Sequence, residues 1–198
     1  MFKKLPLTLT VAIFFFIAAY AGAAEAKNPM VIMDTTFGKI KIELFQKEAP
    51  VTVANFLEYA GSSFYNGTIF HRIVPASPQS AIVVIQGGGL TPDMQPKATR
   101  KAIKNEATNG LKNDRGTLSM ARSSDPDSAT SQFFINVQNN DFLNSPSPDG
   151  FGYAVFGKVI EGMNVVDKIV ATPIKSLNRV FQGVPVTPVV IKSVTLIK

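Results

Sequence analysis

Apolar and polar residues alternate strictly near the start of the chain, over Lys39 to Leu44. A period of two is typical of an antiparallel strand with one buried face. A short apolar run at 31–33 precedes it, and Asp34 to Gly38 between them has the composition of a turn. This pattern predicts that residues 31–44 form a β-hairpin.

Two later segments have the spacing of amphipathic helices. Over 50–60, apolar residues recur three, four and seven positions apart, with Pro50 at the first helical position and Gly61 as the stop. A shorter apolar stripe over 163–170 ends before Pro173. We therefore predict two helices.

Most of the remaining apolar runs are short, as strands are. The predicted strands cover 68–74, 82–86, 116–121, 132–136, 152–159 and 189–197, with a helical turn at 140–143 and a long loop at 90–115. In the last strand, Val190, Val194 and Leu196 are expected on one face. Seven or eight short strands and two helices predict a mainly β protein: a closed antiparallel barrel whose ends are capped by the helices.

The first 23 residues have the layout of a cleavable signal peptide. Lys3 and Lys4 precede an apolar run from about Leu7 to Tyr20, and an Ala-Gly-Ala sequence at 21–23 follows. A membrane anchor is the alternative, but the run is shorter than the roughly 20 residues that span a bilayer. We predict cleavage near Ala23, with a cut after Ala26 as the alternative, and a single domain over 24–198.

The amino-acid composition argues against two classes of function, nucleic-acid binding and metal binding through cysteine or several histidines. Removing residues 1–23 takes the Lys and Arg count from 20 to 18 against 14 acidic residues, a net charge of about +4. No dense basic block indicates nucleic-acid binding. Cysteine is absent and there is one histidine, which excludes thiolate and multi-histidine metal sites.

The remaining chemistry centres on Phe70-His71-Arg72 and on Gln86, which opens a run of three glycines. No G-x-S-x-G elbow accompanies the histidine, and the glycines lack the G-K-[ST] of a phosphate loop. They indicate close backbone approach at a strand end. A cation beside an apolar pocket suits a proline residue in a peptide, whose amide rotates over a barrier of about 18–20 kcal/mol without any cofactor.

The chain strongly resembles the cyclophilin family of peptidyl-prolyl cis-trans isomerases, most closely its bacterial periplasmic members. The motifs that carry the resemblance run in the family's order over nearly the whole of 24–198: Asn55-Phe56, Phe64 to Arg72, Ile85 to Gly88, Gly116 to Ala121, Ser131 to Ile135 and Val155 to Val159. The resemblance implies an eight-stranded antiparallel barrel capped by two helices, which agrees with the strand count above.

It also implies roles for individual residues. Arg72 matches the arginine that bonds the substrate near the prolyl nitrogen, and Gln86 the glutamine that orients it. Phe134 matches the floor of the proline pocket and Leu143 a wall, while the backbone of Ala121 and Arg122 matches the strand that holds the residue before proline.

Three further residues join the expected substrate-binding set: Gln132, Phe142 and Tyr153. Many relatives have asparagine at the position of Arg122. Phe142 and Tyr153 stand where many relatives have tryptophan and histidine, which resembles the bacterial pattern.

The connection between Arg72 and Gln86 is six residues longer than is usual in the family. The phenylalanine and methionine of the family's pocket align with Val83 and Val84, which are smaller. At about 25 cal/mol per Å², the lost apolar cover is on the order of 1 kcal/mol, which predicts weaker or altered catalysis. The insertion at 75–84 is alternatively expected to fold over the groove.

Two functions follow from these expectations. The first is an isomerase of Xaa-Pro bonds that assists the folding of exported proteins, periplasmic or secreted, monomeric, and independent of metals and cofactors. The second is a module of the same fold that holds proline-containing polypeptides with little turnover. A lipocalin-like carrier fits a barrel in general but not these motifs.

Overall fold

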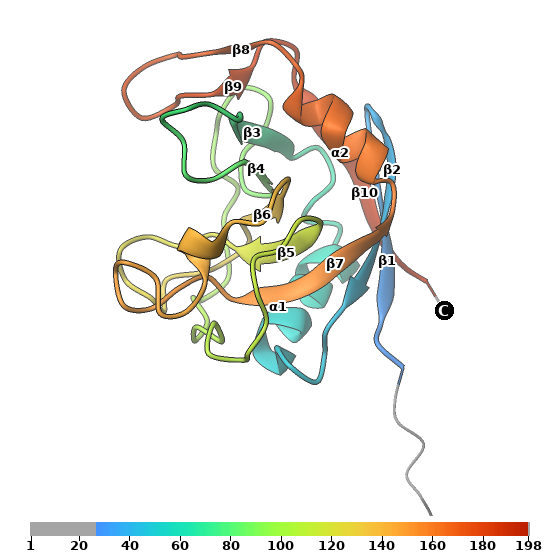
Figure 1. Ribbon diagram of the computed structural model, residues 1–198. Coiled ribbons are helices and arrows are strands. Elements are labelled where there is room, and N and C mark those ends of the chain that lie inside the picture. Colours follow the sequence, from blue (N-terminus) through green and yellow to red (C-terminus); the bar gives the residue numbers. More distant parts are fainter. Residues whose placement is uncertain (1–26, 198) are drawn as a thin grey trace, which may run out of the picture.

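The computed structural model describes residues 27–197, so the predicted signal peptide lies outside the described residues. Eight strands close into a barrel in the order β1-β10-β3-β4-β6-β5-β7-β2, with every pair antiparallel (Figure 1). Their bounds are β1 Met30–Thr35, β2 Gly38–Leu44, β3 Ile69–Val74, β4 Val84–Gly87, β5 Thr117–Met120, β6 Phe133–Asn136, β7 Val155–Glu161 and β10 Val189–Ile197. The predicted barrel is confirmed.

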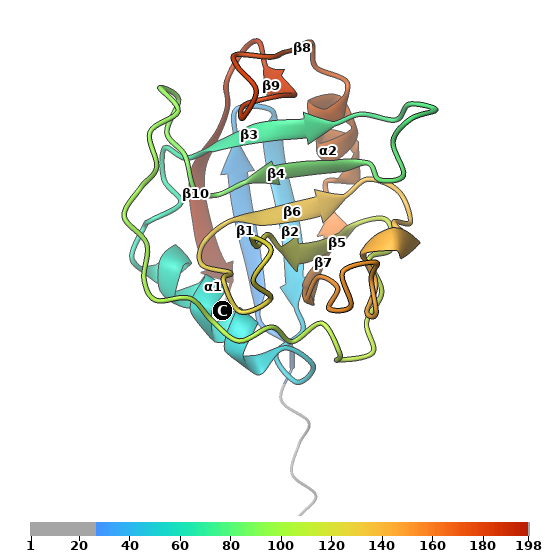
Figure 2. The same cartoon turned by 90° about the vertical axis from the view of Figure 1, so that its left-hand side faces the viewer.

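The two helices lie on opposite sides of this barrel (Figure 2). Helix α1 covers Pro50–Gly61 and α2 covers Met163–Val170, as their apolar spacing predicted. The Glu106 carboxylate accepts bonds from the first free N–H groups of α1, at Val51 and Thr52 (3.1 and 2.8 Å), and so ties the long loop to the helix. Within residues 27–197, neither helix is long and apolar enough to cross a membrane.

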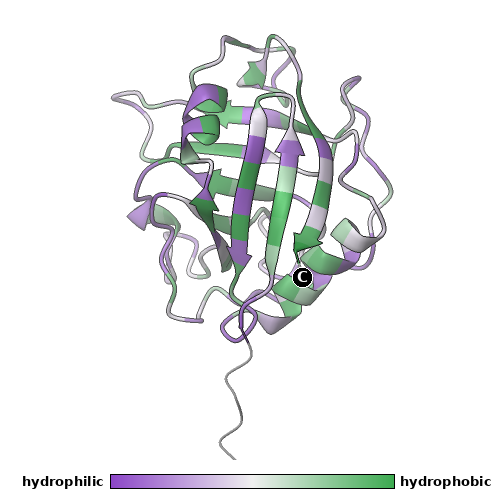
Figure 3. Ribbon diagram, turned by 90° about the vertical axis from the view of Figure 1, so that its right-hand side faces the viewer, coloured by the Kyte–Doolittle hydropathy of each residue, from purple (hydrophilic) through white to green (hydrophobic). Residues whose placement is uncertain are grey.

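The barrel interior is filled by aromatic and aliphatic side chains. Phe56 of α1 packs against Tyr65, Phe133 and Phe156, with ring centroids 5.1 to 5.7 Å apart. Hydrophilic and hydrophobic positions alternate along the long strands at the front of Figure 3. The predicted hairpin of β1 and β2 shows this alternation, and its inward residues are fully buried.

Strand β10 corrects one expectation. The strand has an irregularity in its pairing with β1, where Asp34 pairs with Ser193 but Thr35 pairs with Ile191. One extra residue on β10 switches the alternation at that point. Val194 is buried as expected, but Leu196 is 51% exposed, and Ile191 rather than Val190 points into the core.

A short second sheet was not predicted. Strands β8, Ile174–Lys175, and β9, Val184–Pro185, form a two-stranded hairpin above β3 (Figure 1). Gly183 accepts a bond from the N–H of Ile73 (2.7 Å), which attaches the hairpin to the strand that carries Arg72. Segment 140–143 contains a 3-10 turn, η1, at Asp141–Leu143.

Candidate active site

Three neighbouring strands bring Arg72, Gln86 and Phe134 into one row. The register pairs Arg72 of β3 with Gln86 of β4, and Gln86 with Phe134 of β6. Side chains directly opposite each other across antiparallel strands lie on the same face of the sheet. The row is therefore fixed by strand pairing, although the three residues are spread over more than 60 positions of the chain.

A bulge in β3 makes Arg72 point outward. Phe70 pairs with Gly87 and Arg72 with Gln86, which leaves His71 as an extra residue. Without it, Phe70 and Arg72 would face the same side, because side chains alternate along a strand. With it, Phe70 is fully buried in the barrel while Arg72 is exposed at the pocket.

A chain of hydrogen bonds orients the arginine. Nη1 of Arg72 donates to Oε1 of Gln86 (3.2 Å), and Nε2 of Gln86 donates to Oε1 of Gln132 (3.0 Å). Gly89 leaves room for Gln132, because a Cβ at Gly89 would lie 2.5 Å from the glutamine Cγ. The expected close approach of the glycine run is thus confirmed.

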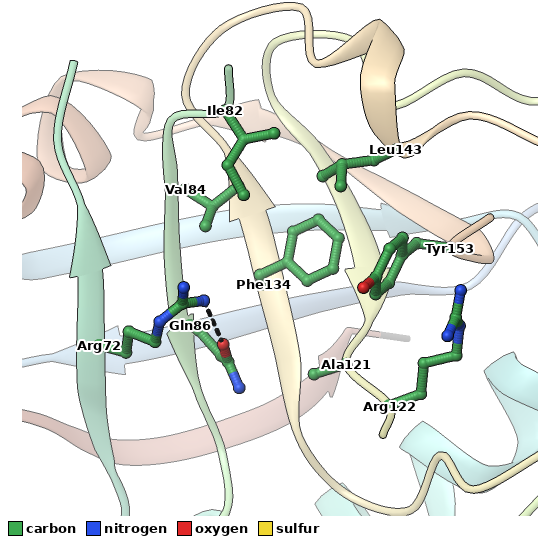
Figure 4. A pocket seen from close by; sticks show the side chains of 9 residues that line it. All are labelled: Arg72, Ile82, Val84, Gln86, Ala121, Arg122, Phe134, Leu143 and Tyr153. Carbon is green, nitrogen blue, oxygen red and sulfur yellow. Dashed lines mark hydrogen bonds between the residues drawn. The ribbon is translucent and has the colours of Figure 1, made fainter. Parts of the chain in front are cut away.

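Beside Arg72 lies a small cavity of about 120 Å³ (Figure 4). This volume is about four times the share of one water molecule in the liquid. Its floor is the ring of Phe134, which is 5% exposed and meets the ring of Tyr153 edge-on at 5.6 Å. The lining residues are Arg72, Ile82, Val84, Gln86, Ala121, Arg122, Phe134, Leu143 and Tyr153.

The side chain of Arg122 supports the pocket from behind. Its guanidinium lies over the Tyr153 ring, 4.4 Å from the centroid, and donates to the carbonyl of Gly152 (3.1 Å) and to Asp149 (2.5 Å). Only 3% of that side chain is exposed. Bonds from Ser147 first and then Arg122 hold the pKa of Asp149 below its usual range. The contacts of Arg122 therefore fix the loop that carries Tyr153.

Three predicted residues lie outside the cavity. Val83 faces the barrel core, and Ile82 occupies the wall instead. Gln132 lines an adjoining hollow of about 270 Å³. Phe142 is 56% exposed on η1 and does not line the cavity, whereas its neighbour Leu143 does.

The sequence contained a signal for Ile82. Alternation counted back from Gln86 along the strand selects Val84 and then Ile82 for the pocket face. The expected loss of apolar cover at Val83 and Val84 is therefore offset, since Ile82, from the insertion, packs against the cluster of Val84, Phe134 and Leu143. The insertion itself projects from the ends of β3 and β4 (Figure 2).

His71 is a neutral structural neighbour of the site. It is 7% exposed, and its Nδ1 has no hydrogen-bond partner among residues 27–197. Burial lowers the pKa of the imidazole to about 4, with a smaller contribution in the same direction from the charge of Arg72. At neutral pH the ring therefore carries no charge.

Comparison with known proteins agrees with this geometry. Residues 30–196 match the family model described as cyclophilin type peptidyl-prolyl cis-trans isomerase/CLD. The chain is 56% identical over 169 residues to the peptidyl-prolyl cis-trans isomerase of Acinetobacter baylyi, covering 85% of this chain and 86% of that one. It is 53% identical to peptidyl-prolyl cis-trans isomerase B of Escherichia coli, covering 84% of this chain and 99% of the relative.

Solved structures show the same fold. A cyclophilin type peptidyl-prolyl cis-trans isomerase of Cryptosporidium parvum, crystallised in the presence of the dipeptide Ala-Pro, superposes with a TM-score of 0.70. It is 30% identical, and the match covers 85% of this chain and 99% of that one. The family match over the whole barrel and the high identity to bacterial relatives lead to one conclusion: this chain belongs to the cyclophilin-type peptidyl-prolyl cis-trans isomerase family.

Proposed function

We propose that this protein accelerates the cis-trans isomerisation of Xaa-Pro bonds, with Arg72 as its catalytic residue. The observation that carries the proposal is the exposed guanidinium of Arg72 beside an apolar cavity of about 120 Å³. A prolyl ring fits the apolar floor formed by Phe134, while the amide that must rotate lies next to the cation.

The chemistry follows from the amide bond. Resonance between the nitrogen lone pair and the carbonyl keeps the bond planar, with a rotation barrier of about 18–20 kcal/mol. An N–H donor aimed at the prolyl nitrogen localises that lone pair and weakens the resonance. The guanidinium has five N–H donors, of which one is used on Gln86, so others remain for the substrate.

The neighbouring residues hold the substrate while it turns. Phe134, Val84 and Leu143 form an apolar cluster that would grip the ring. On the other side, Ala121 lines the same cavity, at the end of β5, where the residue before proline would pass. The Gln86–Gln132 bond keeps the arginine from swinging away, which places the donor before the substrate arrives.

The test is a protease-coupled isomerisation assay on residues 24–198, with Arg72→Ala measured beside the wild type. We expect about a 100-fold or greater loss of kcat/KM, the usual effect of removing one preorganised donor. Equal rates for the two proteins would disprove the catalytic role of Arg72. If peptide binding is measurable while the wild type isomerises at the background rate, the protein holds proline-containing chains instead of turning them over.

We further propose that the protein acts on exported polypeptides outside the cytoplasm. The support is the charge and hydropathy pattern of residues 1–23, which is typical of a signal peptide. Fusing residues 1–30 to alkaline phosphatase, which is active only after export, tests this. A fusion in which Leu7 to Tyr20 is interrupted by two arginines is the control, and equal activity of both fusions would exclude the proposal.

A further inference from the structure

Under the proline pocket lies a buried network of three asparagine side chains: Asn113, Asn136 and Asn140. Each is at most 1% exposed. Nδ2 of Asn140 donates to Oδ1 of Asn136 (2.7 Å), and Nδ2 of Asn136 donates to Oδ1 of Asn113 (3.2 Å). Burying an amide side chain costs free energy unless its polar atoms are hydrogen-bonded. We therefore ask which backbone groups these three side chains bind.

Asn140 binds the backbone at the end of the insertion. Its Oδ1 accepts from the N–H of Val83 (2.9 Å), and its Nδ2 donates to the carbonyl of the same residue (3.1 Å). This pair imitates the bonds that a neighbouring strand would make. Val83 stands between Ile82 and Val84, so the clamp sets the direction of both pocket side chains.

Asn113 binds the opposite wall. Its Nδ2 donates to the carbonyls of Leu143 (3.1 Å) and Tyr153 (3.4 Å), both of which line the cavity. The backbone N–H of Asn140 also donates to the carbonyl of Asn113 (2.8 Å). One network therefore reaches the backbone of both walls.

At the position of Asn140 in the chain, an asparagine side chain would normally cap a helical turn. It is the N-cap residue of η1, where asparagine is preferred because its side chain bonds the next turn. Here the side chain makes no capping bond, and both of its polar atoms are used on Val83 and Asn136. Turn formation alone does not account for it.

We propose that Asn140 is a positioning residue, which holds the insertion and the η1 segment together so that Ile82 and Leu143 grip the prolyl ring. This rests on the function proposed above. Asn140 touches neither Arg72 nor Gln86, so its removal should weaken substrate binding and leave the rotation step of the bound peptide unchanged.

The experiment compares Asn140→Ala with Thr35→Ala. Thr35 is also buried, and its hydroxyl makes two bonds, to Gly38 and Phe37, in the β1–β2 turn away from the cavity. The dissociation constant of a tetrapeptide with an Ala-Pro bond is measured by NMR titration. The exchange rate of the bound peptide is measured in the same samples, at a temperature where all variants are folded.

We expect Asn140→Ala to raise the dissociation constant about tenfold, which corresponds to about 1.4 kcal/mol, and to change the bound exchange rate less than about twofold. Thr35→Ala should lower the melting temperature without changing either value. An unchanged dissociation constant in Asn140→Ala, or an equal rise in Thr35→Ala, would overturn the proposal. Asn140→Asp keeps only the acceptor for Val83 and serves if the alanine variant does not fold.

A double-mutant cycle tests whether Asn140 affects peptide binding through Ile82. If Asn140 acts through Ile82, then Ile82→Ala should weaken binding less in the Asn140→Ala background than in the wild type. Full additivity would refute that route. The methyl NMR shifts of Ile82 and Leu143 in the free protein provide a readout without substrate: they should move in Asn140→Ala even if the wild type proves to be no isomerase.

Discussion

His71 gives this protein a sharply defined pH dependence of stability. Its imidazole is buried, its Nδ1 has no hydrogen-bond partner in the described part of the chain, and burial lowers its pKa from 6.5 to about 4. When the pH falls below 6.5, the unfolded chain takes up a proton that the folded chain does not accept. The free energy of unfolding therefore decreases from about pH 6.5 and stops changing on this account below about pH 4.

The size of the effect follows from the two pKa values. One unit corresponds to about 1.36 kcal/mol, so the full shift is worth about 3 kcal/mol, and the part lost between pH 7 and pH 4.5 is about 2 kcal/mol. Carboxylates also begin to titrate near the lower end of that interval. They do so equally in a variant without the histidine, so comparison of the two proteins isolates the contribution of His71.

The chain contains one histidine, which makes the measurement direct. On protein without a histidine tag, the ring-proton NMR signals of His71 report its pKa. Urea unfolding at pH 7 and pH 4.5 then gives the stability change for the wild type and for His71→Asn. Between pH 7 and pH 4.5, the free energy of unfolding of the variant should fall by about 2 kcal/mol less than that of the wild type. A pKa near 6.5, or an equal loss in both proteins, would refute this account of the buried imidazole.

Two substitutions around the pocket should have distinct effects. In Gly89→Ala the new methyl group would displace Gln132, release Gln86 and lower kcat/KM about fivefold to tenfold, since one net hydrogen bond is worth about 1 kcal/mol. Gly61→Ala, at the end of α1, also needs no positive φ and meets no described atom within 4 Å, so it controls for adding a methyl group at a glycine; an equal loss there would refute the argument. Arg122→Leu should free the loop that carries Tyr153, weaken peptide binding several-fold in equilibrium titration, and raise the pKa of Asp149; unchanged binding would show that the loop holds without Arg122.

Much of the fold was predictable because its signals are local. The alternation over Lys39 to Leu44 marked a strand, and the three-to-four spacing after Pro50 marked α1. The short strands indicated a closed barrel. The motif resemblance then supplied its eight strands and the association of Arg72 with Gln86 and Phe134, which strand pairing places in one row. These predictions succeeded because each element's local preference agrees with the fold as a whole.

The bulges were not predictable in this way. His71 and Arg72 together interrupt an apolar run, and nothing in that pattern shows that His71 is an extra residue in the ladder. The same is true of the irregularity in β10, which put Val190 out of phase with the buried Val194. A bulge is defined by the partner strand, and a single strand's sequence does not contain that partner.

The asparagine network was missed for a related reason. Asn113 and Asn140 stand in polar, turn-forming sequence, where asparagine usually indicates a loop at the surface. In the fold, β6 ends at Asn136, and the chain turns back so that Asn140 pairs with Val83 in place of a strand. A turn-forming residue thereby becomes part of the core.

This pairing explains how the chain accommodates the longer connection that the family resemblance implies between Arg72 and Gln86. Val83 is held by Asn140 and by the N–H of Val137 (2.9 Å), so the register of β4 is set from its β6 side. The extra residues are therefore confined to the loop before Ile82, where added length costs little because each doubling of a loop adds only about 0.6 kcal/mol. Arg72 still meets Gln86 across the strands, and Ile82 adds to one wall of the pocket while the row of Arg72, Gln86 and Phe134 keeps its geometry.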